Sequence, residues 1–408
     1  MLNASIDDPF MKEVQDKVKE WRRHLHRNPE LSFKEEKTSQ FVFDELMSFG
    51  GLKVTRPTRT SVMARLIGEK PGKVLGLRAD MDALPIQEET NLEFASDTAG
   101  VMHACGHDGH TAMLLGAAKI LSQRKDEIRG EIRFIFQHAE ELPPGGAQEL
   151  VRRGVVDDVD YIVGLHLMST LSKGKIGIVY GPITSNSDTF DLKIKGKGGH
   201  SSQPENSIDP IAMSAQIISN LQQIVSRNLD PSEKLVVSTT TLQAGTAKNV
   251  IPETVQIGGS VRSFSPNVRK QAVSLIERIV KGVTEAHGGS YEFHYQYGYD
   301  SVINDLELTK AVEELIVEEF GSEYVEHGEG MMGGEDFSAY LAKAPGCFVA
   351  VGARNEEKGI MYPHHHPRFD IDEEALKDGV RILVNLPKKI LCNQKDSISR
   401  TNSRKELI

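Results

Sequence analysis

The pattern of apolar positions predicts an alternation of helices and strands along the first part of the chain. Apolar residues spaced three and four apart are typical of amphipathic helices, and short unbroken apolar runs are typical of buried strands. Helices are predicted at residues 10–28, 34–49 and 111–122, and strands at residues 73–77, 131–137 and 161–165. Strands that alternate with helices indicate an α/β sheet covered by helices on both faces.

Residues 184–297 follow a different pattern. Residues 188–194 alternate between polar and apolar side chains, as a half-exposed strand does. Further strands are predicted at residues 235–242, 255–261 and 291–297, and helices at residues 210–226 and 266–287. This combination predicts a compact sheet with two helices, inserted into the α/β domain.

The 408 residues are therefore predicted to form two domains. The first is an α/β domain with a mixed sheet covered by helices on both faces, made of residues 1–183 and 298–391. The second is the smaller, inserted α+β domain of residues 184–297. The last residues, 392–408, are polar and are predicted to form a disordered tail.

Composition narrows the class of protein. The chain is 39% hydrophobic and 26% charged, as soluble globular proteins are. Its formal net charge is −10 and it has no long basic run, so we expect no nucleic-acid partner. We see no secretory signal and no run near the roughly 20 apolar residues that span a bilayer, so we expect no membrane association. The three cysteines argue against a disulfide framework and indicate a reducing, cytoplasmic compartment.

Polar side chains gather where the predicted strands end. Asp82, Glu140, Glu141 and His166 each come at or just after the end of a predicted strand. Sites in open α/β sheets lie beyond the carboxyl ends of the strands. These four side chains are therefore predicted to be neighbours.

The adjacent pair Glu140 and Glu141 follows a strongly apolar strand and sits beside His138. Such a pair is usually a solvated surface feature. In an extended segment, however, neighbouring side chains point in opposite directions. One carboxylate could then bind a metal ion while the other faces the substrate, a division that suits metal-assisted hydrolysis with a general base.

Cys105 and His107 are separated by a single glycine, so a thiolate and an imidazole could reach one ion, as they do in zinc sites. Taken alone, such a pair is more often part of a glycine-rich turn with satisfied polar groups. A lone histidine such as His166 is more often a hydrogen-bonded core residue, and the histidines at 364–366 could be a surface cluster. The occurrence of all these groups at separate strand ends and loops of one domain favours a metal-dependent hydrolase.

Motifs over nearly the whole chain, about residues 10–390, carry a resemblance to a known family. They are WRRHLHRNPELSFKE (21–35), LRADMDALPI (77–86), MHACGHDGHTAMLLGAAKIL (102–121), FQHAEELPPGGA (136–147), GLH (164–166), KGKGGHSSQP (195–204), GTAKNVIPE (245–253), GGEDF (333–337) and HHHPRFDIDE (364–373). In these motifs the chain resembles the M20 metallopeptidases. The similarity is to the amidohydrolase branch, with its aminoacylases, hippurate hydrolases and indole-acetyl-amino-acid hydrolases.

The resemblance implies a site with two divalent metal ions, whose ligands match Cys105, His107, Glu141, His166 and His365. It also implies that Glu140 is the general base and that Asp82 orients a metal-ligand histidine. His365 is chosen over its two neighbours because the family pattern places the histidine two residues before the proline.

In the inserted domain, which the resemblance identifies as a lid and dimerisation domain, His200 matches the donor to the oxyanion. The alternative is a lid histidine that only shapes its loop. Asn249 and Arg262 match positions that bind the free carboxylate of the substrate, and a structural salt bridge is the alternative for Arg262. Similar enzymes form a homodimer or homotetramer through this domain.

The metal and the substrate are left open by the sequence. Asp80 stands where the wider family has a histidine, and Cys105 where it has a bridging aspartate. A thiolate favours softer ions such as Zn²⁺ and carboxylates accept Mn²⁺, with Co²⁺ or Ni²⁺ also possible.

The function that we expect is hydrolysis of the amide bond of small N-acyl-amino acids. The alternatives are a dipeptidase or carboxypeptidase on the same scaffold and, more remotely, a non-catalytic binding protein of the same fold.

Overall fold

The computed structural model describes residues 9–391, so the tail predicted at residues 392–408 lies outside the described residues. Contacts divide these residues into two compact units. Unit one comprises residues 9–181, 303–329 and 339–391, and unit two comprises residues 182–302 and 330–338. Each unit has its own hydrophobic core.

Unit one is built around a mixed sheet, which has eight strands among the described residues. In spatial order these are β1 (Lys53–Thr55), β2 (Val62–Ile67), β4 (Arg129–Gln137), β3 (Lys70–Asp80), β5 (Tyr161–Ser172), β16 (Gly346–Arg354), β6 (Ile176–Ile178) and β15 (Val325–His327). The central strands β4, β3, β5 and β16 run parallel. β2 pairs antiparallel with β1 and β4, whereas β6 pairs antiparallel with β16 and parallel with β15. The mixed α/β sheet predicted from the sequence is confirmed.

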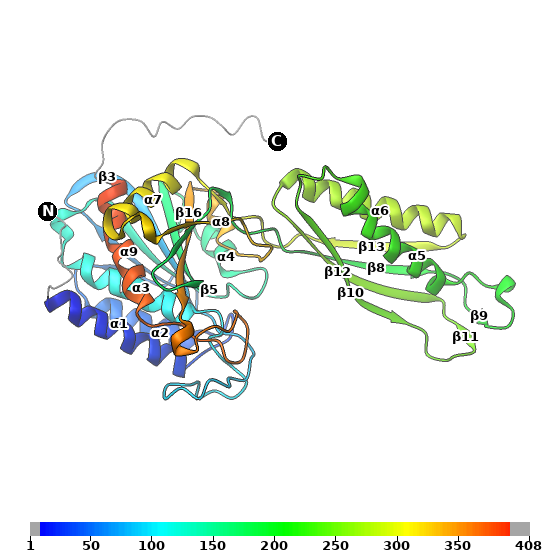
Figure 1. Cartoon of the computed structure of the whole chain (residues 1–408), viewed down its shortest axis with the longest axis horizontal. Coiled ribbons are helices and arrows are strands. Elements are labelled where there is room, and N and C mark those ends of the chain that lie inside the picture. Colours follow the sequence, from blue (N-terminus) through cyan, green and yellow to red (C-terminus); the bar gives the residue numbers. More distant parts are fainter. Residues whose placement is uncertain (1–8, 392–408) are drawn as a thin grey trace. The chain divides into compact units, whose positions relative to one another are not determined.

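Helices surround this sheet (Figure 1). Their bounds are α1 (Pro9–Arg27), α2 (Glu36–Ser48), α3 (His107–Ser122), α4 (Gly146–Arg152), α7 (Leu306–Phe320) and α9 (Ala375–Leu391). Helices α1, α3 and α9 pack against one another. In β4 every residue from position 131 to 137 is buried, and since alternate side chains point to opposite faces, both faces of the sheet are covered there.

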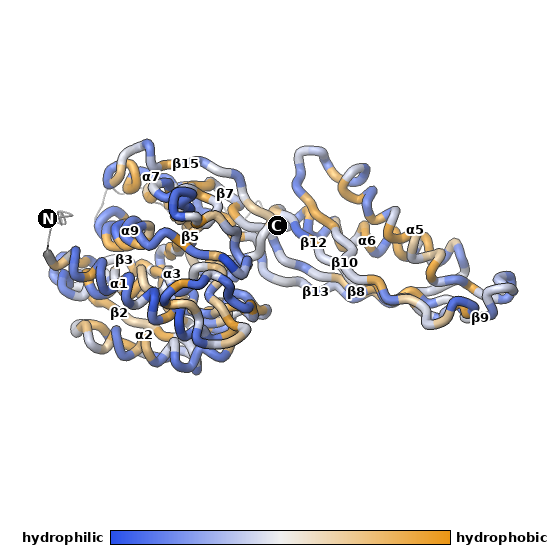
Figure 2. The backbone as a smooth tube through the Cα atoms, turned by 60° about the horizontal axis from the view of Figure 1, so that its bottom comes forward, coloured by the Kyte–Doolittle hydropathy of each residue, from blue (hydrophilic) through white to orange (hydrophobic). Residues whose placement is uncertain are grey.

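Unit two is a four-stranded antiparallel sheet with helices on one face (Figure 1). Its strands in spatial order are β10 (Leu235–Ala244), β12 (Thr254–Ser263), β8 (Asp188–Lys195) and β13 (Ser290–Gln296), and its helices are α5 (Pro210–Gln223) and α6 (Pro266–Ala286). Asp209 and Ser265 cap the two helices at their N-termini. Both helices alternate between hydrophobic and hydrophilic positions along their turns, as helices with one buried face do (Figure 2).

Several short elements complete the chain. They are β7 (Gly181–Pro182), β9 (Gly199–His200), β11 (Val250–Ile251), β14 (Ile303–Asn304) and α8 (Ser338–Leu341). Residues 330–338, which the sequence assigned to the α/β domain, pack instead with unit two. Backbone hydrogen bonds cause this, from Met331 N to Ile183 O and from Ser185 N to Gly333 O. No helix within residues 9–391 is long and apolar enough to cross a membrane.

Candidate metal centre

Three carboxylates meet at the carboxyl ends of β3 and β4, which are parallel neighbours in the sheet. Asp82 follows β3, and Glu140 and Glu141 follow β4. Asp82 holds both glutamates through their backbones: its Oδ1 accepts Glu140 N–H and its Oδ2 accepts Glu141 N–H, each at 3.0 Å. Since parallel strands end at the same edge, the prediction that these three residues are neighbours is met by the geometry.

Cys105 and His107 lie at the start of α3, which begins at His107 rather than at the predicted residue 111. Gly106 precedes the helix with a left-handed backbone, φ 95°, a conformation that glycine adopts without penalty. Nearly every residue of α3 is buried, so the helix lacks the polar face that would have shown its first turn in the sequence.

His166 lies within a strand, and the expectation that it ends one is wrong. β5 continues to Ser172 because it pairs with β16 past that point, with Met168 opposite Gly352. The His166 imidazole packs near Cys105, with Nε2 3.6 Å from Sγ. Its Nδ1 lies 2.9 Å from Leu167 O, which places the proton on Nδ1 and leaves Nε2 as the ligand atom.

The three neighbouring histidines have different surroundings. His365 has a left-handed backbone, φ 65°, and its Nε2 lies 3.1 Å from Glu141 Oε1. His364 accepts the Ser169 N–H through Nε2 at 3.2 Å, and its ring centroid lies 5.2 Å from that of His166. His366 accepts a backbone N–H from its own loop. The geometry therefore agrees with the choice of His365.

Two candidate ligand groups among the described residues share Cys105. The first is Cys105, His107 and His166, and the second is Cys105, Glu141 and His365; within each group the ligand atoms all lie within 4.8 Å of one another. These are the five ligand positions that the family resemblance implied. Two groups with one common thiol are suited to two ions bridged by that thiol.

Asp82 also orients His107. The imidazole Nδ1 lies 2.9 Å from Asp82 O and 3.2 Å from its Oδ1, so the N–H points at Asp82. The other nitrogen, Nε2, is buried and has no hydrogen-bond partner among the described residues. Leaving a buried polar atom unsatisfied is costly, and a bound cation at Nε2 would satisfy it.

The electrostatics of the site also fit a cation. Burial, and then the carboxylates of Glu141 and Glu140, raise the pKa of the Cys105 thiol well above its usual range. Burial lowers the pKa of His107, but Asp80 and Asp82 outweigh it and raise that pKa to about 10. The site thus gathers more buried negative charge than it can neutralise without holding protons. Divalent ions would take the place of those protons.

The side chains of Glu140 and Glu141 do not point in opposite directions. The expectation that they would, which assumed an extended segment, is wrong. Ala139, directly before them, has a left-handed backbone, φ 48°, which bends the chain. Carboxylate oxygens of both glutamates lie within 4.8 Å of a His107 nitrogen and of each other. The bend turns both side chains toward the same imidazole.

His110 is a residue of this site that the sequence reasoning missed. Its Nδ1 lies 2.6 Å from Asp80 Oδ1, and its Nε2 accepts the Leu167 N–H at 2.8 Å. Arg78 occupies the other oxygen of Asp80 at 2.6 Å. Both Asp80 oxygens are therefore engaged, which suits a supporting carboxylate. The signal for His110 was its place one helical turn after His107.

The remaining predicted residues lie in unit two. His200, in β9, pairs with Val250 of β11, and Ser201 N donates to Asn249 O at 3.1 Å, so His200 and Asn249 are side by side. Arg262 Nη1 donates to the carbonyl oxygens of Asp188 and its own neighbour in β12. No ion pair involves Arg262 among the described residues, so the salt-bridge alternative has no carboxylate to support it.

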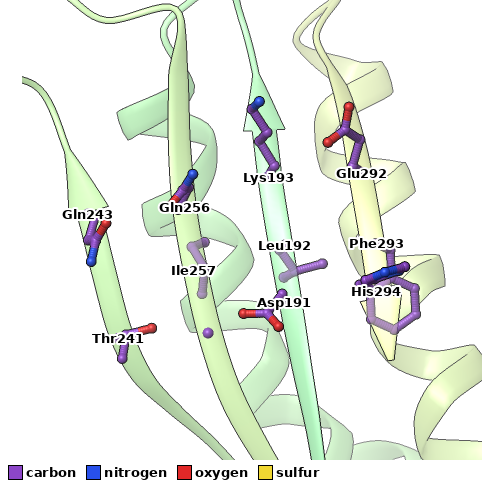
Figure 3. Close-up of a pocket in the computed structure, with 11 residues that line it drawn as sticks. Asp191, Leu192, Lys193, Thr241, Gln243, Gln256, Ile257, Glu292, Phe293 and His294 are labelled. Carbon is purple, nitrogen blue, oxygen red and sulfur yellow. The ribbon is translucent and has the colours of Figure 1, made fainter. Parts of the chain in front are cut away.

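A hollow in unit two lies over the face of the sheet that α5 and α6 leave open (Figure 3). Side chains of all four strands line it, including Asp191, Lys193, Gln256, Glu292 and His294. None of the residues predicted for catalysis, metal binding or substrate binding lines this hollow. The hollow is therefore not the site that the sequence predicts.

Comparison with known proteins places this cluster in a family. The family described as peptidase family M20/M25/M40 matches residues 76–389, a range that holds all ten predicted site residues. The chain belongs to this family. It is a metal-dependent hydrolase of the amidohydrolase branch, as the motifs indicated.

Individual relatives agree with this assignment. The chain is 63% identical, over 72% of its length and 79% of the relative's, to an N-acyl-L-amino acid amidohydrolase of Geobacillus stearothermophilus. It is 42% identical, over 90% and 94%, to thermostable carboxypeptidase 2 of Saccharolobus solfataricus. A solved structure from Bacillus subtilis, described as a dinuclear metal-binding peptidase of the M20 family, is 38% identical with a TM-score of 0.82, covering 92% of this chain and 98% of its own.

Proposed function

We propose that the protein hydrolyses the amide bond of small N-acyl-amino acids at a site for two divalent ions, releasing a carboxylic acid and a free amino acid. The observation that carries the proposal is the pair of ligand groups that share Cys105, with Glu140 beside them. The 63% identity to an N-acyl-L-amino acid amidohydrolase supports the substrate class.

In this proposal His107 and His166 would hold one ion, Glu141 and His365 would hold the other, and Cys105 belongs to both ligand groups. The ions, when bound, would supply Lewis acidity and lower the pKa of the attacking water. Thiolate and imidazole ligands favour Zn²⁺, whereas the carboxylate also accepts Mn²⁺, and Co²⁺ or Ni²⁺ can occupy the same donors.

Glu140 takes the proton of the attacking water and delivers it to the leaving amine nitrogen. Its backbone N–H is fixed by Asp82 at 3.0 Å, and its carboxylate lies within 4.8 Å of the His107 and Glu141 ligand atoms. The side chain is almost fully buried, so water that would compete for its proton is largely excluded. Asp82 thus aligns the base and the ligands together.

His200 is proposed as the hydrogen-bond donor to the oxyanion. Its Nδ1 accepts the Ser202 N–H at 3.1 Å, so the neutral imidazole carries its proton on Nε2 and can donate it. Asn249 and Arg262 are proposed to bind the free carboxylate of the substrate, which a guanidinium can grip with two parallel hydrogen bonds. Replacing Arg262 with alanine should raise KM for N-acyl-amino acids but not for the matching N-acyl amines, which lack the carboxylate.

Glu140→Gln tests the core of the proposal. Gln keeps the shape but cannot accept a proton, so kcat on N-acetyl- and N-benzoyl-amino acids should fall by about 10²–10⁴-fold. Metal content, measured by elemental analysis after loading with Mn²⁺, Zn²⁺, Co²⁺ or Ni²⁺, should not change. Glu89→Gln, at a carboxylate that is 56% exposed, is the matched control. Full activity in Glu140→Gln would remove Glu140 from the reaction.

Cleavage of peptides is the second candidate function, favoured by the 42% identity to a carboxypeptidase. A panel of dipeptides and longer peptides, run beside the N-acyl-amino acids, separates the two. We expect kcat/KM to be higher for the N-acyl-amino acids. A higher value for the peptides would replace the first proposal with the second.

Assembly and location follow as further proposals. We propose a homodimer or homotetramer joined through the inserted domain and a cytoplasmic site of action. Light scattering of the intact protein and of a variant altered on β10 or β13, the edge strands of the unit-two sheet, would test the assembly.

A further inference from the structure

Three consecutive backbone N–H groups in the bend after β4 each point at a carboxylate oxygen. Asp82 accepts the N–H groups of Glu140 and Glu141, as described above. Glu35, from the loop before α2, accepts the Ala139 N–H through Oε1 at 2.7 Å. The Glu35 side chain is fully buried, with 0% of its surface exposed.

The bend needs such support because of Ala139. Its φ of 48° lies in the left-handed region, which a side chain with a Cβ atom seldom adopts. The hydrogen bond from Ala139 N to Glu35 exists only while the peptide has this orientation. If the residue relaxed to an extended conformation, the chain after it would change direction, and the Glu140 and Glu141 carboxylates would move away from His107. Glu35 therefore acts on the conformation that places the two glutamates beside His107.

Glu35 is itself held in a rigid loop. The same Oε1 atom accepts the Phe33 N–H at 3.0 Å, and Phe33 also has a left-handed backbone, φ 65°. The Phe33 ring packs edge-on against His138, with ring centroids 5.6 Å apart. A single oxygen thus ties the loop before α2 to the bend that carries the catalytic base.

The second oxygen, Oε2, is buried and makes no hydrogen bond with any described residue. Burial, and then the nearby charge of Asp82, raise the pKa of Glu35 to about 7. Both facts indicate that Glu35 acts as a hydrogen-bond acceptor whose oxygen lies at a fixed position, and that its negative charge contributes little. A glutamine side chain has the same length and places an acceptor oxygen at the same position. An aspartate keeps the negative charge, but its side chain is shorter by one methylene group.

We propose that Glu35 is a positioning residue for catalysis, which holds the Ala139 peptide so that Glu140 faces the reacting atoms. This inference rests on the proposed role of Glu140. Glu35 touches neither substrate nor ligand atoms in the proposal. Its effect should therefore fall on kcat measured at saturating metal, while KM should stay unchanged, and any shift of Glu141 should appear separately as a weaker metal affinity.

Glu35→Gln and Glu35→Asp test the inference together. Gln should keep kcat within about threefold of the parent protein, because the amide oxygen accepts both N–H groups. Asp should lower kcat by about 10–100-fold, because a shift of about 1 Å at a catalytic group has effects of this size. Glu36→Gln and Glu36→Asp are the controls, since the Glu36 side chain is 57% exposed and should be indifferent to both changes.

Amide hydrogen exchange of the metal-free protein gives a readout that does not depend on turnover. A peptide spanning residues 138–141 should exchange faster in Glu35→Asp and as slowly as the parent in Glu35→Gln. Equal kcat for both variants, or a greater loss in Gln than in Asp, would overturn the inference. If Glu140→Gln is inactive while both Glu35 variants keep full kcat, only the role of Glu35 fails; if Glu140→Gln stays active, the proposed function fails first.

Discussion

Metal loading of the metal-free protein should release at least two protons near neutral pH. At about pH 7.5 the Cys105 thiol is protonated, because burial and the surrounding carboxylates raise its pKa well above the usual range. His107 is protonated too, because Asp80 and Asp82 outweigh burial and raise its pKa to about 10. Both must lose a proton before they can bind an ion.

The direction of the pH dependence follows from these protons. Both pKa values are raised, so below them protons compete with the metal, and raising the pH removes the competitor. With at least two protons displaced, the logarithm of the apparent metal affinity should rise by at least about two for each pH unit between about pH 6 and 8. Glu141 raises the pKa of His365 as well, so His365 adds to the slope at the lower end of this range. His166 adds nothing, because burial, and then its histidine neighbours, hold its pKa well below the usual range and it is already neutral.

Isothermal titration with Zn²⁺ or Mn²⁺ in phosphate, HEPES and Tris buffers counts the protons, because the buffers differ in ionisation enthalpy. Cys105→Ser supplies the control, because a serine hydroxyl that binds a metal ion weakly stays protonated. The number of protons released should fall by about one, and the metal affinity should fall as well. A count clearly below two in the parent protein would refute the reasoning. So would an identical count in Cys105→Ser, which would show that the thiol is not a ligand.

Two further substitutions test the supports of the site. Asp82 uses both carboxylate oxygens to accept the Glu140 and Glu141 N–H groups, and Asp82→Asn leaves only one acceptor oxygen. Metal affinity, measured by competition with a chelator, should therefore fall by about 10–100-fold. Unchanged affinity would contradict the orienting role of Asp82. Arg22→Met removes a buried guanidinium that pairs with Asp108 at 2.9 Å, and should lower the free energy of unfolding by about 3–5 kcal/mol in urea titrations. Arg23→Met, at a side chain that is 47% exposed, should lower the free energy of unfolding by less than about 1 kcal/mol. Equal losses of stability in the two variants would show that burial of the arginine does not determine the size of the loss.

The part of the site that the sequence predicts best is the part that follows from sheet topology. Asp82, Glu140 and Glu141 were expected to be neighbours because they follow buried strands, and β3 and β4 are indeed adjacent and parallel. His166 was placed by the same rule at a strand end, but β5 runs on to Ser172. His166 is a single polar residue that interrupts the apolar run, whereas the strand continues through Leu167 and Met168 because β16 still pairs with it.

The supporting residues were beyond the reach of sequence patterns. The motif of residues 21–35 was noticed only as part of a family resemblance, without a chemical role for any member. In the structure Arg22 pairs with Asp108, next to His107, and Glu35 binds the Ala139 backbone, next to Glu140. Both contacts join segments far apart in the chain, and neither hydrophobic period nor residue spacing carries information about such contacts.

The proposed roles of Glu140 and Glu141 do not follow from the geometry that the sequence suggested. The sequence argument assigned one carboxylate to the metal and one to the base because an extended chain would separate them. In the structure the bend at Ala139 brings both to His107, so direction cannot distinguish them. What distinguishes them is His365, whose left-handed backbone places Nε2 3.1 Å from Glu141 and joins that glutamate to the Cys105 group. The loop at residues 364–366, rather than the strand before the glutamates, is therefore the reason why we propose Glu141 as the ligand.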